Sequence, residues 1–93
     1  MLIIAHHNIS DPEGFWSAAE RTTNNVPADL KLIAVYPSQD GKTGTCLWEA
    51  GEVQEVQDFL DQTASQYAEN FCYEVNLAQS VGLPTLETAA SLS

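Results

Sequence analysis

The residues of this chain that could do acid–base chemistry are two adjacent histidines, His6 and His7, and a glutamate, Glu49. The histidines lie at the end of one expected strand and Glu49 at the end of another. If these strands are parallel neighbours, about 4.8 Å apart, Glu49 shares a face with only one histidine, because side chains alternate along a strand. A histidine beside a carboxylate can act as a general base or proton shuttle. His6, His7 and Glu49 are therefore the candidate catalytic residues; the alternative is that both histidines are ordinary polar residues at a strand end.

The same residues could also bind a soft divalent metal if Cys72 lies near them, since histidine, cysteine and glutamate side chains are its usual ligands. The start of the fourth expected strand, over residues 69–76, runs antiparallel to the end of the first, which places the Cys72 thiol within range of the histidines. The sequence has no His-x-His, His-x-x-x-His or paired-cysteine spacing, and no glycine-rich phosphate loop. We therefore expect no metal and no cofactor, and keep divalent-metal binding as an alternative. Cys46 and Cys72 are expected to be buried apolar side chains rather than a disulfide.

Three aromatic residues on expected strands, Tyr36, Trp48 and Tyr73, could line a pocket for a planar organic molecule. The alternative is that they pack the core, as aromatic side chains on strands commonly do. These three are the candidate pocket-lining residues.

The composition is strongly acidic: the net charge is −10, and the cations are Arg21, Lys31 and Lys42. Phosphate backbones and anionic membrane surfaces are held by clustered lysine and arginine, so we expect neither nucleic acid nor a membrane as a partner. No segment approaches the roughly 18–20 apolar residues that span a bilayer. The opening residues lack the basic flank of a signal peptide. We expect a cytoplasmic protein with a solubilising acidic surface.

Hydrophobic periodicity and turn signals divide the chain into six elements. Strand patterns cover residues 2–8, 30–38, 43–50 and 69–76, and helical patterns cover 12–23 and 52–67. The first helix can begin at an Asp11 cap with Pro12 in its first turn, or at a capping box of Ser10 and Glu13. Asp40-Gly41 marks a hairpin turn between the second and third strands.

This order of strands and helices is that of a split βαβ unit. The fold class is therefore α+β: a ferredoxin-like βαββαβ domain over residues 1–84, with a four-stranded antiparallel sheet and both helices on one face. Residues 85–93 are expected to form a poorly ordered tail. Successive strand residues face opposite sides of the sheet, and the strands carry apolar side chains at both odd and even positions, such as Leu2 and Ile3. Both faces of the sheet should therefore be shielded from water. A second copy packing sheet to sheet would cover the face without helices, which predicts a homodimer.

On these features the chain resembles the dimeric α+β barrel superfamily, which includes antibiotic-biosynthesis-monooxygenase-like and muconolactone-isomerase-like proteins. More narrowly, it is similar to small bacterial domains of that superfamily, some of them nickel-binding. The resemblance covers roughly residues 2–84, and its pieces are the first strand through Ile4, the Asp40-Gly41 hairpin, Cys46-Leu47-Trp48-Glu49-Ala50 leading into Val53 and Val56, and Phe71 to Val75. It implies a dimer with an interior pocket between the two sheets. It implies no single activity, because this fold carries isomerases, oxygenases, cyclases and simple binders.

Three functional hypotheses follow. The first is a binding or accessory module that holds a small apolar or aromatic ligand in the dimer interior. The second is a cofactor-independent isomerase, cyclase or oxygenase that uses His6 or His7 with Glu49. The third is a divalent-metal-binding or purely structural interaction protein.

Overall fold

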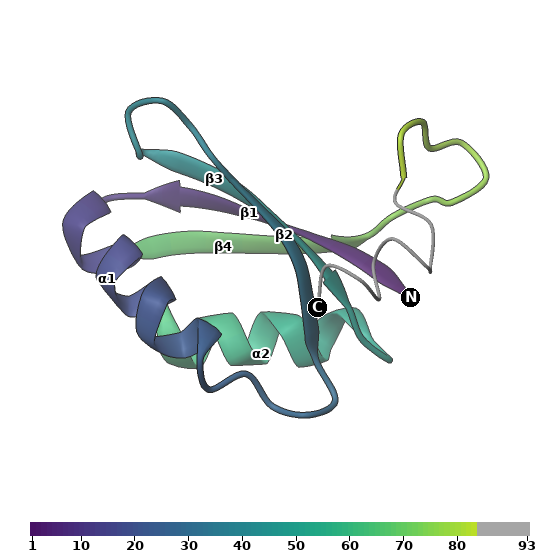
Figure 1. Cartoon of the computed structure of the whole chain (residues 1–93), viewed down its shortest axis with the longest axis horizontal. Helices are drawn as coiled ribbons and strands as arrows, with labels where there is room; N and C mark the ends of the chain where they lie inside the picture. Colours follow the sequence, from purple (N-terminus) through teal and green to yellow (C-terminus); the bar gives the residue numbers. More distant parts are fainter. Residues whose placement is uncertain (84–93) are drawn as a thin grey trace.

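The chain forms two helices and four strands in the predicted order (Figure 1). The structure is a computed structural model, and it describes residues 1–83. The elements are β1 (Leu2–Ile9), α1 (Pro12–Thr23), β2 (Lys31–Pro37), β3 (Thr43–Glu49), α2 (Val53–Thr63) and β4 (Ala68–Glu74). The second helix ends four residues earlier than predicted, because the backbone leaves the helical conformation at Ala64 so that β4 can begin opposite Ile9. The tail predicted for residues 85–93 lies outside the described residues.

The four strands form one sheet in the order β2-β3-β1-β4, and every neighbouring pair is antiparallel. The parallel pairing expected for β1 and β3 is therefore wrong. The connection through α1 carries the chain back so that β2 runs in the same direction as β1, and the hairpin then reverses β3. The result is an α+β fold with a four-stranded antiparallel sheet, and it is compatible with the predicted ferredoxin-like arrangement.

Helix α1 begins at the Asp11 cap, the first of the two predicted alternatives. Asp11 Oδ1 accepts a hydrogen bond from the Gly14 amide at 3.1 Å, and Pro12 occupies the first turn. At the same end, Trp16 Nε1 donates to the Gly41 carbonyl at 3.1 Å, which ties α1 to the β2–β3 hairpin. Its ring lies against Gly44, where a Cβ would sit 3.2 Å from the indole, so the absence of a side chain on β3 makes this close approach possible.

The side chain of Gln57 links helix α2 to β4 by two hydrogen bonds. Its amide nitrogen donates to the Asn70 carbonyl at 2.9 Å, and its amide oxygen accepts from the Cys72 amide at 3.1 Å. These bonds satisfy backbone groups on the outer edge of β4, which would otherwise lack strand partners. The backbone of α2 accordingly lies close to β4 and β1, whereas that of α1 keeps a greater distance from the sheet.

Both helices lie on one face of the sheet (Figure 1). The main core forms on this face around Ile3, Ala5, Trp48, Val56 and Leu60, all of which are buried. None of the described helices has the length and apolar character needed to cross a membrane.

The opposite face of the sheet, called here the open face, is also largely apolar. Ile33 and Leu47 are buried on it, because a bulge in β2 between Leu32 and Ala34 turns Ile33 to this side. Tyr36 and Phe71, by contrast, are 66% and 65% exposed. No helix among residues 1–83 covers these side chains.

Candidate functional site

The predicted catalytic residues do not come together. In the antiparallel register His7 lies opposite Gly44, whereas Glu49 lies opposite Leu2. Five residue steps along a strand correspond to about 17 Å, so Glu49 and the histidines are at opposite ends of the sheet. His7 faces the helices and is 1% exposed, and His6 lies on the open face. The isomerase, cyclase or oxygenase hypothesis thereby loses the carboxylate on which it depended.

His7 has other partners, which the two strands flanking β1 provide. Its Nδ1 lies 2.6 Å from Asn70 Oδ1 on β4, and its Nε2 lies 3.2 Å from Cys46 Sγ on β3. An amide oxygen can only accept, so Nδ1 carries the proton and Nε2 accepts from the Cys46 thiol. The orientation of the Asn70 amide is consistent with this, because its nitrogen donates to the Ala68 carbonyl. Asn70 therefore fixes the tautomer and the ring orientation of His7.

Burial sets the ionisation state of this group. It lowers the pKa of His7 below the ordinary value of 6.5, and the hydrogen bond to Asn70 opposes this effect. Burial likewise raises the pKa of Cys46 to about 12, with a smaller contribution from Cys72. The pair is therefore a neutral thiol and a neutral imidazole at neutral pH, and not a thiolate–imidazolium pair.

The cysteines are free and buried, as predicted. Both pair with Ala5, Cys46 from β3 and Cys72 from β4, so β1 lies between them. Two strand spacings amount to about 9.6 Å, which exceeds the Cα separation that a disulfide allows. Within residues 1–83, no group of three or more His, Cys, Asp or Glu side chains is arranged to hold a metal ion.

The low pKa of His7 predicts acid-sensitive stability. As the pH falls through 6.5, the unfolded chain takes up a proton at this residue before the native chain does, so the free energy of unfolding should fall as the pH falls. The fall is at most about 1.4 kcal/mol per pH unit for one proton. We expect urea unfolding to give a lower free energy of unfolding at pH 5.5 than at pH 7.5. The free energy of unfolding of His7→Gln should depend less steeply on pH. Equal slopes for the two proteins would contradict the neutral, buried assignment.

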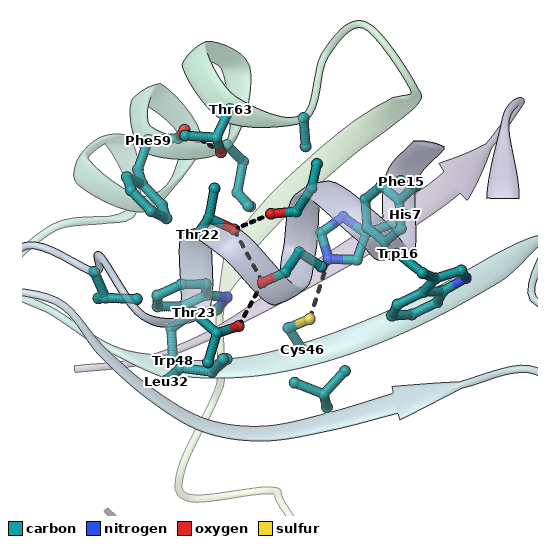
Figure 2. A pocket seen from close by; sticks show the side chains of 16 residues that line it. His7, Phe15, Trp16, Thr22, Thr23, Leu32, Cys46, Trp48, Phe59 and Thr63 are labelled. Carbon is teal, nitrogen blue, oxygen red and sulfur yellow. Dashed lines mark hydrogen bonds between the residues drawn. The ribbon is translucent and has the colours of Figure 1, made fainter. Parts of the chain in front are cut away.

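A pocket lies between α1 and the sheet, where α1 stands away from the strands (Figure 2). Its cavity has a volume of about 50 Å³. The space remains open because Ala18 and Ala19 of α1 have small side chains. His7 and Cys46 form part of the pocket wall. Trp48 and Phe59 close it from β3 and α2, with their rings edge to face and their centroids 5.8 Å apart. The site that the structure supports is therefore on the helix side of the sheet.

The three predicted pocket aromatics are divided between the two faces. Trp48 is in the wall of the helix-side pocket and is 3% exposed. Tyr36 and Tyr73 are exposed on the open face, where they line a shallow groove of about 410 Å³ together with Asn76 and residues 79–83. The expected single aromatic pocket is therefore not formed within one chain.

Asn70 was not among the site residues predicted from the sequence, and Cys46 was predicted only as a buried packing residue. A signal for both was present once the strand order was known, because antiparallel pairing of β1 with β3 and β4 places residues 46 and 70 beside residues 5 and 7. No protein-family model, no curated protein and no solved structure matches this chain. The α+β fold class is therefore assigned from the observed helices, strands and sheet order alone.

Proposed function

We propose that this protein binds a small, neutral, largely apolar molecule in the pocket between α1 and the sheet. The observation that carries the proposal is the chemical character of the pocket wall. Most of its side chains are apolar or aromatic, and it includes no Lys, Arg, Asp or Glu from the described part of the chain. The one titratable base in the wall, His7, is held neutral by burial. Such a wall favours an uncharged ligand, because a buried charge without a partner is costly.

The size of the cavity limits the ligand. A cavity of 50 Å³ corresponds to one or two water molecules. A ligand with one ring must therefore extend into the mouth of the pocket, where Thr23 and Val35 reach solvent. The proposed site differs from the dimer interior expected from the sequence, because it lies on the helix-covered face.

Binding of cyclohexanone tests this function. We expect an increase in melting temperature that grows with ligand concentration, because a ligand that binds only the native state stabilises it by mass action. Ala19→Leu places a larger side chain in the pocket wall and should weaken binding at least tenfold. Ser17→Leu adds the same side chain to the exposed side of α1 and is the matched control. Equal binding by the two variants would show that cyclohexanone occupies another site, and absence of binding would contradict the proposal.

We further infer that the open face pairs with a second copy of the chain. Support comes from the combination of buried Ile33 and Leu47 with exposed Tyr36, Phe71 and Tyr73 on one sheet face. Exposed apolar surface of this kind is typical of a protein interface. A closed pair of identical faces would cover it in both copies.

A further inference from the structure

One polar group in the pocket wall has no partner. Among the described residues, the buried indole nitrogen of Trp48 has no hydrogen-bond partner. The residue is 3% exposed. A buried donor left unpaired costs about 1–3 kcal/mol. The contact with Phe59 and the surrounding core hold the ring in this orientation.

The other polar groups of the pocket are already hydrogen-bonded. The Thr22 hydroxyl donates to the Ala18 and Ala19 carbonyls at 3.0 and 3.2 Å, and the Thr23 hydroxyl donates to Ala19 at 2.7 Å. Both ring nitrogens of His7 have partners. The indole nitrogen of Trp48 is directed toward the threonine end of α1, into the pocket (Figure 2). The pocket wall is thus apolar, and one unpaired N–H donor lies just behind it with less than 1 Å² of accessible surface, so a ligand reaches this donor only when neighbouring side chains move aside.

We propose that Trp48 Nε1 anchors the ligand by donating a hydrogen bond to a carbonyl oxygen, so that the ligand class is a neutral ketone, aldehyde or ester with an apolar body. This inference rests on the proposed binding function. An indole N–H is a donor only, so the ligand has to supply the acceptor. A carbonyl needs no further partner, whereas an alcohol would bring a proton that needs an acceptor of its own. A carboxylate would bring a charge that no cation in the described wall neutralises.

Selectivity follows from this arrangement. A site with a buried hydrogen-bonding group binds an analogue that lacks the matching atom poorly, because the protein group then stays unpaired. Cyclohexanone and methylenecyclohexane have nearly the same shape, and a methylene group replaces the oxygen in the second, so that only the ketone offers a strong hydrogen-bond acceptor.

The test compares both molecules on the wild type and on Trp48→Phe, which keeps an aromatic ring and removes the N–H. We expect the substitution to weaken cyclohexanone binding about tenfold, which corresponds to about 1.4 kcal/mol, and to leave methylenecyclohexane binding unchanged or tighter. Dissociation constants from NMR titration measure both effects. An equal change for the two molecules would overturn the carbonyl anchor while leaving the pocket in place. If neither molecule binds the wild type, the proposed function itself fails.

A measurement on the wild type covers the case in which Trp48→Phe does not fold. The chain has two tryptophans, and Trp16 Nε1 already donates to the Gly41 carbonyl. Of the two indole N–H signals in a ¹H–¹⁵N spectrum, cyclohexanone should move that of Trp48 downfield, and methylenecyclohexane should not. A downfield shift with both molecules, or with neither while binding occurs, would overturn the anchor.

Discussion

Replacing His7 by alanine is expected to lower the free energy of unfolding by about 2–4 kcal/mol. The side chain is 1% exposed, and its ring lies 5.1 Å from that of Phe15. The substitution leaves a cavity beneath α1. It also removes the donor to Asn70 Oδ1 and the acceptor for the Cys46 thiol. Both effects act in the same direction, so the loss should be among the largest of any single substitution in this chain.

The matched control is the neighbouring histidine. His6→Ala removes the same atoms from the open face, and we expect it to cost less than about 1 kcal/mol. Urea denaturation of the three proteins at equal concentration and pH 7.5 gives the comparison. Similar losses for the two variants would show that the contacts of His7 with Asn70 and Cys46 do not hold the fold together.

Replacing Phe71 by aspartate is expected to prevent the proposed pairing of two chains through their open faces. Phe71 is 65% exposed on the open face, so the substitution removes no buried contact within one chain. In a pair of sheets it would place a carboxylate in an apolar interface, opposite a copy that already has a net charge of −10. Burying an unpaired charge costs several kcal/mol in such a setting.

Sedimentation of the wild type, Phe71→Asp and Ser17→Asp provides the measurement. Ser17→Asp adds the same charge to the exposed side of α1 and should leave the dimer intact. A wild type that sediments as one chain at working concentration would contradict the pairing of open faces. So would a Phe71→Asp variant that remains a dimer.

The elements of the fold were accessible from the sequence because their signals are local. Asp11 and Pro12 mark the start of α1, and Asp40-Gly41 marks the hairpin. The end of α2 could not be predicted from local signals. The helical pattern continues through Ala64 and Tyr67, and the pairing of β4 with β1 interrupts it. That pairing involves residues far apart in the chain, which a local pattern does not record.

The site was predicted only in part, for the same reason. His7 was singled out by its residue type, but its partners follow from the direction of β3. A parallel β3 would have brought Glu49 to the histidines, and the antiparallel strand brings Cys46 instead. The role of Trp48 depends on a hydrogen bond that is not made. Such a feature is visible only when the surrounding side chains are in place.

The proposed ligand is a small carbonyl compound that binds between α1 and the sheet, at Trp48. The most direct test is a crystal structure of the protein with cyclohexanone. We expect ketone density in the pocket beside Ala19 and Phe59, with the oxygen within about 2.7–3.2 Å of Trp48 Nε1. Ketone bound instead in the groove beside Tyr36 and Tyr73, or absent from a pocket that remains as it is here, would contradict the claim.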